Sequence, residues 1–427
     1  MYEIILTSSP EGPMIAFDAS TGATVALFTG SRSPCRGLMV TSQGFIAASH
    51  VSSNTGTGSI HIYNWHTPTV FQNIPLPEPV APLAATLDGD FLFAGGVSGS
   101  IHSLSLPSGD IIKTCTPYSK PVSSLHLSDD GSLLISGNND GTIVVIPSFK
   151  LVDDSSTCSD PILHKWKAHS DSVTCFNSGI CIHTCTFVSC SMDCTCKFWS
   201  LSNGITLMRT VTFPCAIFGL VMDSTESGFY AGGSDGFVYK GLMKVGNRKM
   251  LEKGKAYELV NLGNKTKSHD GSIMSLVLVN EGRNLVSASE DGSVWMWDVE
   301  KGEVIMVLGN DQILGRRSTR SIGDMIVVKG SNVTKGNASS KGGAISGFSS
   351  SGLSDEEVIK TLMKITELGN VMDVAVHDKR RAIDMLESAI AMYERLLRLI
   401  LKEVTKAIEE ADHEDEDLDN KGKKDEN

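Results

Sequence analysis

Short alternating strands recur seven times within the first 329 residues, and each recurrence contains a tight turn, usually built around glycine or Asp-Gly. The residues at the centres of these turns are Gly12, Gly58, Gly99, Gly141, Cys194, Gly236 and Gly292. Their separations are 46, 41, 42, 53, 42 and 56 residues, close to the ~40–45 residues of a four-stranded propeller blade, with the longer intervals indicating insertions. The period therefore predicts an all-β, seven-bladed propeller over residues 1–329.

The last unit shows how the period arises. LVSASEDG alternates inward- and outward-facing residues as one strand, and SVWMWD does so as the next. Between them Gly292 permits the positive φ that a tight turn needs, and Asp291 can bond its own backbone. KSHDGSIMSLVLV supplies an inner strand and VIMVLG, at 304–309, an outer one, which completes four strands.

The first unit has only three strand candidates, EIILTSS, PMIAFD and TVALF. The segment DMIVVK at 324–329 follows the seventh unit and can supply the missing inner strand. A C-terminal strand would then latch the first blade and remove an open sheet edge. We therefore expect a chain that is truncated before Asp324 to aggregate.

The units resemble WD repeats, whose pattern is Gly-His, an inner strand, a Ser-rich strand, Asp-Gly and a strand ending in Trp-Asp. The Trp-Asp pair appears in full as Trp297-Asp298. It appears in weakened form as Trp199-Ser200, Tyr63-Asn64 and Phe17-Asp18. The resemblance implies buried hydrogen-bonded tetrads in two blades: His269, Ser287, Asp291 and Trp297 in one, and His169, Ser189, Asp193 and Trp199 in the other. The sequence leaves the polar networks of the other five blades open.

Two units are enlarged after the Asp-Gly strand, at residues 148–161 and 244–267. Both insertions connect equivalent strands, so we expect them to leave the same face of the propeller on either side of the fifth blade. The second insertion carries a local charge of +5. It is either a solvated loop or a contact for the RNA backbone or an acidic partner. The candidate contact residues are Lys244, Arg248, Lys249, Lys253 and Lys255.

The chain changes character after the repeats. Residues 330–353 are rich in glycine and serine, which is typical of a flexible tether. Ser354 and Glu357 then form a capping box that predicts the start of a long helix over residues 354–410. Of the net charge of -12, residues 409–427 carry -7, and the acidic tail at 411–427 is too charged to fold.

The predicted helix carries an apolar seam with the spacing of a coiled coil. The principal seam residues are Leu362, Ile365, Met372, Ile383, Leu386, Ile390, Tyr393, Leu397, Ile400 and Val404. A single rod cannot bury such a seam within itself, so a partner helix is required. The alternatives are a second copy of the chain, which the regular seam after Arg381 favours, another protein, or a hairpin formed at residues 377–381.

Candidate chemical motifs favour packing over catalysis. The string GGSDG at 232–236 matches a nucleophile elbow in letters, but it lies between two β-strands and not at a strand-to-helix turn. Six cysteines between Cys175 and Cys196, with His169 and His183, contain no C-x-x-C pair and follow strand alternation, so we expect buried thiols and no zinc. We expect no enzyme activity, no cofactor, no metal, no export signal and no membrane span. Ten cysteines without an export signal favour a reducing compartment, where we expect no disulfides.

The order of parts resembles a specific family. A divergent propeller begins almost at residue 1, contains the second-blade string TGTGSIHIYNWH and is followed by a tether and one long helix. This arrangement is similar to the Ipi-three / WD-repeat-protein-eighteen family, and most closely to its plant members, called ROOT INITIATION DEFECTIVE.

The resemblance implies a non-catalytic scaffold subunit of the Rix-one (PELP-type) complex, located in the nucleus, in nucleolus and nucleoplasm. That assembly acts on large-ribosomal-subunit precursors, in pre-rRNA processing and in recruiting the AAA ATPase Midasin. The resemblance also implies a homodimer formed through the C-terminal helix. Two rival classes stay open: a substrate receptor or scaffold in another nuclear assembly such as a ubiquitin ligase, and an enzyme with its site in the central channel. Propellers serve many functions, so the ribosomal role depends on the resemblance alone.

Overall fold

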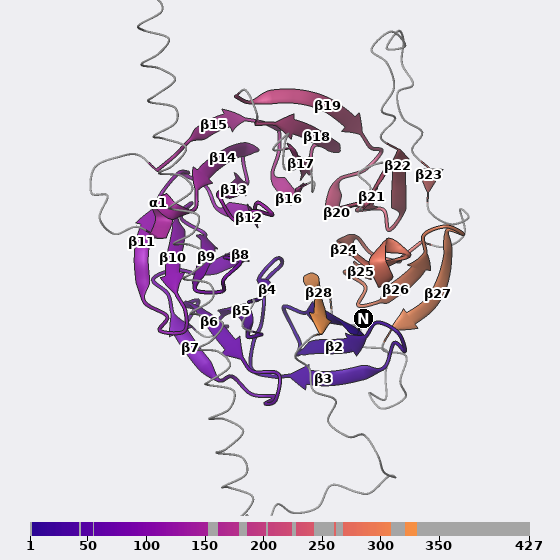
Figure 1. Cartoon of the computed structure of the whole chain (residues 1–427), viewed down its shortest axis with the longest axis horizontal. Coiled ribbons are helices and arrows are strands. Elements are labelled where there is room, and N and C mark those ends of the chain that lie inside the picture. The colour runs from indigo at the N-terminus through magenta and orange to yellow at the C-terminus, as the bar shows by residue number, and fades with distance from the viewer. Residues whose placement is uncertain are drawn as a thin grey trace, which may run out of the picture. The chain divides into compact units, whose positions relative to one another are not determined.

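Seven four-stranded antiparallel sheets surround a central axis, so the predicted seven-bladed propeller is confirmed (Figure 1). The computed structural model describes residues 2–330 except for 42–43, 54, 153–160, 179–185, 202–203, 224–227, 243–259, 262–267 and 309–320. The predicted tether, long helix and acidic tail lie outside the described residues, and so does each residue of the basic candidate contact between Lys244 and Lys255.

The strands of each blade follow one another in the chain, with the first blade as the exception. From the channel outward, blade 1 contains β28 (Asp324–Gly330), β1 (Tyr2–Ser8), β2 (Met14–Asp18) and β3 (Thr24–Phe28). Blade 2 contains β4 (Leu38–Val40), β5 (Ile46–Val51), β6 (Gly58–Tyr63) and β7 (Gln72–Pro75). Blade 3 contains β8 (Val80–Ala85), β9 (Phe91–Gly96), β10 (Ile101–Ser105) and β11 (Ile111–Cys115).

The remaining blades repeat this plan. Blade 4 contains β12 (Val122–Leu127), β13 (Leu133–Asn138), β14 (Thr142–Pro147) and β15 (His164–Lys167), with the short helix α1 (Phe149–Val152) after β14. Blade 5 contains β16 (Val173–Ser178), β17 (Thr186–Ser191), β18 (Thr195–Ser200) and β19 (Thr206–Thr212). Blade 6 contains β20 (Ile217–Met222), β21 (Gly228–Gly233), β22 (Val238–Leu242) and β23 (Val260–Asn261). Blade 7 contains β24 (Ile273–Val279), β25 (Asn284–Ser289), β26 (Val294–Asp298) and β27 (Glu303–Leu308), with a 3₁₀ turn at Asn280–Gly282.

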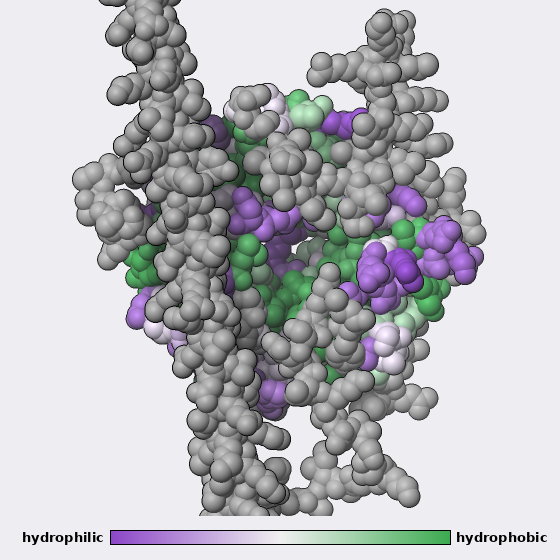
Figure 2. Space-filling view, in the orientation of Figure 1, coloured by the Kyte–Doolittle hydropathy of each residue, from purple (hydrophilic) through white to green (hydrophobic). Residues whose placement is uncertain are grey.

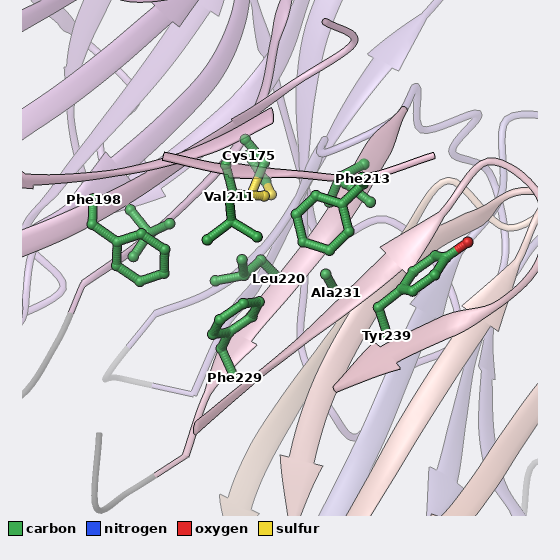
Figure 3. Packing of buried hydrophobic residues seen from close by; sticks show 12 residues of the cluster. Cys175, Phe198, Val211, Phe213, Leu220, Phe229, Ala231 and Tyr239 are labelled. Carbon is green, nitrogen blue, oxygen red and sulfur yellow. The ribbon is translucent and has the colours of Figure 1, made fainter. Parts of the chain in front are cut away.

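The core lies between neighbouring blades. The second and third strands of a blade are covered on both faces, and β21 is buried along its whole length. Outer strands alternate, as in β27, where exposed and partly buried residues succeed one another. Between blades 5 and 6 the rings of Phe198 and Phe229 lie 5.6 Å apart, centroid to centroid, within a cluster of twelve buried residues (Figure 3). Burial of apolar side chains between blades is the main contribution to the stability of the propeller.

The first and last described strands close the ring. β1 and β28 are antiparallel neighbours over seven residue pairs, from Tyr2 opposite Gly330 to Ser8 opposite Asp324. The prediction that a C-terminal strand completes the first blade is therefore confirmed. Closure gives the inner edge of blade 1 a partner strand.

The antiparallel order of the strands divides the connections between two faces. The first-to-second and third-to-fourth strand connections emerge on one face, which we call the insert face because both enlarged connections, β14 to β15 and β22 to β23, leave from it. The other connections emerge on the opposite face, which we call the turn face. The central opening of the ring is bordered by both hydrophilic and hydrophobic residues (Figure 2).

The turns on the turn face agree with the predicted turn centres at most positions. Gly99, Gly141, Gly236 and Gly292 all have φ between 80° and 90°, and Cys194 takes the same left-handed conformation at 63°. In blade 2 the prediction was wrong: Gly56 has φ 68°, while Gly58 lies in β6. Gly58 instead permits a close approach, because a Cβ there would lie 2.2 Å from the carbonyl oxygen of Glu78.

Candidate functional site

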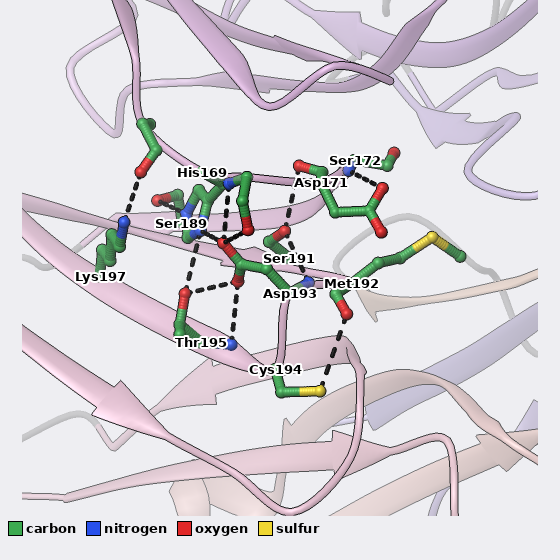
Figure 4. Close-up of polar contacts among 12 residues, drawn as sticks. His169, Asp171, Ser172, Ser189, Ser191, Met192, Asp193, Cys194, Thr195 and Lys197 are labelled. Carbon is green, nitrogen blue, oxygen red and sulfur yellow. Dashed lines mark hydrogen bonds and ion pairs between the residues drawn. The ribbon is translucent and has the colours of Figure 1, made fainter.

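Blade 5 contains a buried polar network that begins at a tryptophan and ends at a carboxylate on the turn face. Figure 4 shows the part of it that contains Ser189, His169 and Asp193. The Trp199 indole N–H donates to Ser189 Oγ at 2.8 Å, and Ser189 Oγ lies 2.8 Å from His169 Nε2. His169 Nδ1 lies 3.0 Å from Asp193 Oδ2. The consistent order of donors is Trp199 to Ser189, Ser189 to His169 and His169 to Asp193, with a neutral imidazole.

Burial supports this assignment. It lowers the pKa of His169, which therefore stays neutral near pH 7. Burial of Asp193 favours its protonated form, but the hydrogen bond from the Thr195 hydroxyl and the neighbouring His169 outweigh that effect and lower the pKa of the carboxyl. Asp193 also accepts the backbone N–H of Ser170 at 3.0 Å. The network thus joins the turn between β17 and β18 to the loop before β16, which is a structural role.

Blade 7 brings together the four predicted residues with one difference. Trp297 Nε1 and His269 Nε2 lie 2.8 Å and 2.7 Å from Ser287 Oγ. His269 Nδ1 lies 2.6 Å from the hydroxyl of Ser293, while Asp291 Oδ2 is 3.8 Å away. His269 is therefore hydrogen-bonded to Ser293 and not to Asp291, whose carboxylate accepts the backbone N–H of Asp270 at 2.9 Å.

Other blades use different side chains for the same purpose. Tyr118 stands four residues before Val122 in blade 4, as His169 stands before Val173, and its hydroxyl lies 2.8 Å from Ser136 Oγ. The fixed offset from the inner strand is a sequence signal that reveals Tyr118 as the substitute. In blade 2 the hydroxyl of Ser31 lies 2.6 Å from the hydroxyl of Tyr63.

Blade 6 replaces the polar network with an aromatic ring. Its tryptophan position is Gly241, and a Cβ there would lie 2.2 Å from the Phe229 ring. The absence of a side chain at Gly241 lets Phe229 fill the space. Blade 3 uses an acid instead, since Glu78 Oε1 lies 2.9 Å from His102 Nε2 and Glu78 accepts the N–H of Ser98 at 2.6 Å.

The central channel is crossed by a side chain. Arg36, in the loop before β4 of blade 2, donates a hydrogen bond to the carbonyl of Phe218 in β20 of blade 6. These blades lie on opposite sides of the ring (Figure 1). A β-bulge between Ile217 and Gly219 disturbs the ladder at Phe218 and makes its carbonyl accessible. Hydroxyl groups join neighbouring inner strands in the same region, as Ser123 does by donating to the Val173 carbonyl at 2.6 Å.

Comparison with known proteins shows which family the chain belongs to. The family described as WD domain, G-beta repeat matches residues 109–146, 161–200 and 261–298. Protein ROOT INITIATION DEFECTIVE 3 of Arabidopsis thaliana is 32% identical over 306 residues, which cover 69% of this chain and 66% of that protein. The chain belongs to this WD-repeat family.

More distant members match over similar lengths. WD repeat-containing protein 18 of Homo sapiens is 25% identical over 316 residues, covering 71% of this chain and 69% of that protein. Pre-rRNA-processing protein IPI3 of Yarrowia lipolytica is 29% identical over 260 residues, covering 59% of this chain and 60% of that protein. The chain therefore spans about two thirds, or somewhat less, of the length of these relatives.

The matched WD repeats are offset from the blades by one strand. The repeat at 109–146 begins with β11, the outer strand of blade 3, and continues through the three inner strands of blade 4. The repeat at 161–200 has the same relation to blades 4 and 5. Each matched repeat therefore links two neighbouring blades.

The cysteines of blade 5 that the structure describes pack as thiols. Cys175, Cys190 and Cys196 are buried on neighbouring strands. The contact with Cys190 and burial raise the pKa of Cys175, and burial raises the pKa of Cys190 and Cys196. Cys181, His183 and Cys185 lie outside the described residues. In the part of the chain that the structure describes, no group of three or more His, Cys, Asp or Glu side chains is arranged to hold a metal ion. None of the described helices is long and apolar enough to span a bilayer.

Proposed function

We propose that this chain is a non-catalytic scaffold subunit that acts in ribosome biogenesis, in maturation of the large subunit and pre-rRNA processing, in the nucleus. The observation that carries the proposal is the relation to proteins named as pre-rRNA-processing factors, IPI3 of Yarrowia lipolytica and crb3/ipi3 of Schizosaccharomyces pombe, through a complete propeller. The polar networks support a scaffold role, since their donors and acceptors hold blades and turns together.

We further propose that the chain joins a Rix-one-type complex as a homodimer, with Midasin and a pre-ribosomal particle as later partners. Support comes from the sequence after residue 353, where large apolar residues recur at coiled-coil spacing. Each such residue left in water forfeits about 1.5–3 kcal/mol, which favours a partner helix. The lysines and arginine of the second insertion, at residues 244–255, are the proposed contact for an RNA backbone or an acidic partner.

Affinity purification of the tagged full-length chain tests the function. We expect it to recover large-subunit precursor RNA and a second, differently tagged copy of the chain. A chain that lacks residues 354–427 should lose the second copy, because the seam is removed, while its propeller still melts cooperatively. Recovery of a cullin adaptor without precursor RNA, or of neither, would contradict the ribosomal role.

Two substitutions separate the seam from the rest of the helix. Ile390→Glu places a charge on the predicted seam, whereas Ser388→Glu places the same charge on the opposite side of the predicted helix. Light scattering should show loss of the dimer for the first variant and an intact dimer for the second. Equal behaviour of the two variants would contradict dimerisation through this seam.

A further inference from the structure

An apolar groove lies between blades 2 and 3 on the insert face. Figure 1 shows these two blades as neighbours at the left and lower left. Its walls come from the connections of both blades and include Phe45, Ile62, Phe71, Gly89, Leu106 and Pro107. Phe45 and Leu106 pack against the buried cluster between these two blades. The floor of the groove is therefore part of the folded core.

Two large apolar side chains on this face remain in solvent: Phe71 in the groove wall, and Leu87 on the turn that contains Gly89. Phe71 is 63% exposed although its ring stacks on Phe45 with centroids 6.2 Å apart, and its backbone N–H is fixed by the Ile62 carbonyl. Leu87 is 61% exposed and lies against the next turn of blade 4, since a Cβ at Gly131 would be 3.3 Å from its methyl group. Exposed apolar groups that the backbone fixes beside a groove are typical of a binding surface.

The turns around these side chains are acidic. Asp88 and Asp90 flank Gly89 in the groove wall, Asp110 ends the turn that contains Pro107, and Asp130 precedes Gly131; all four are exposed. Hydrogen bonds from the hydroxyls of Ser128 and Ser132 lower the pKa of Asp130, so it is ionised near pH 7. The three turns at 86–90, 106–110 and 128–132 contain five aspartates and neither lysine nor arginine.

We propose that this groove binds a short basic segment of a partner protein, with one large apolar side chain seated against Phe71 and flanking lysines or arginines facing the aspartates. The charge of the rim decides the class of partner. Phosphate groups of RNA or of an anionic membrane would be repelled by the aspartates, whereas a basic amphipathic peptide satisfies both the apolar groove and the acidic rim. The inference does not depend on the ribosomal assignment.

A fluorescein-labelled peptide of alternating leucine and lysine clusters tests the proposal with the full-length protein. Fluorescence anisotropy should detect binding of this peptide and at least about tenfold weaker binding to the Phe71→Ser variant, because the apolar anchor is lost. Asp110→Asn should weaken binding less and make it less sensitive to salt, since it removes one rim charge.

Met208→Ser is the matched control, because Met208 is 66% exposed on the outer strand of blade 5, away from the groove. It should bind the peptide as the unsubstituted protein does. A peptide with glutamate in place of lysine should not bind, and a photoreactive leucine in the basic peptide should cross-link at Phe71 or Leu87. Equal affinity of the Phe71→Ser and unsubstituted proteins, or cross-links confined to other blades, would overturn the proposal.

Discussion

Ser189 and Ser103 are both fully buried, and they differ in whether the hydroxyl has a partner. Ser189 lies between Trp199 and His169, while the hydroxyl of Ser103 forms no hydrogen bond. We expect Ser189→Ala to lower the free energy of unfolding by about 1–3 kcal/mol, because it leaves two buried nitrogens unsatisfied. Ser103→Ala is the matched control and should leave it unchanged or slightly higher in urea unfolding. Equal losses for the two variants would contradict a stabilising network.

Buried titratable residues make stability depend on pH. Burial lowers the pKa of His61 and His269 to about 4. Between about pH 6.5 and 4 the unfolded chain therefore binds more protons than the folded chain, and the free energy of unfolding falls as the pH is lowered. Burial raises the pKa of Asp324 to about 6, which has the opposite sign: its contribution is complete below about pH 3.8 and is lost as pH rises through 6.

Burial also lowers the pKa of His126 and His169, so the histidines together outweigh Asp324, and the net effect should be a loss of stability between pH 7 and pH 5. Asp324→Asn removes the opposing term, so that variant should lose about 1 kcal/mol more over the same range. Urea unfolding at pH 5, 6 and 7 measures both. An identical pH profile for the variant and the unsubstituted protein would refute the role assigned to Asp324.

At the scale of the blade, the sequence predicts what depends on local rules. Alternation and turn chemistry located the seven units, and the incomplete first unit predicted the strand at Asp324–Gly330. The resemblance to WD repeats predicted the members of the two tetrads. The substitutes in other blades escaped prediction because they depend on packing across strands: Gly241 has meaning only once Phe229 lies beside it, and Glu78 only once His102 faces it. The prediction of a turn at Gly58 was wrong for the same reason. The residue that requires a glycine there is Glu78, which is close in space but distant in the sequence.

At the scale of the whole molecule, ring closure and the crossing of the channel are long-range features. The pairing of β1 with β28 followed from counting strands, since an unfilled blade edge has to be covered. The contact from Arg36 to Phe218 joins residues 182 positions apart, and neither the residue types nor their spacing predicts it. The exposed Phe71 of blade 2 and the acidic turns of blades 3 and 4 likewise come together only because the fold places them on one face.

A strand from the C-terminal side closes the propeller ring, and comparison of two truncated chains tests this closure most directly. A chain ending at residue 330 retains β28, whereas a chain ending at residue 315 lacks it. We expect the first to be monomeric in light scattering and to melt in one cooperative transition, and the second to aggregate because β1 has an open edge. A monomeric, cooperatively melting 1–315 chain would contradict the account.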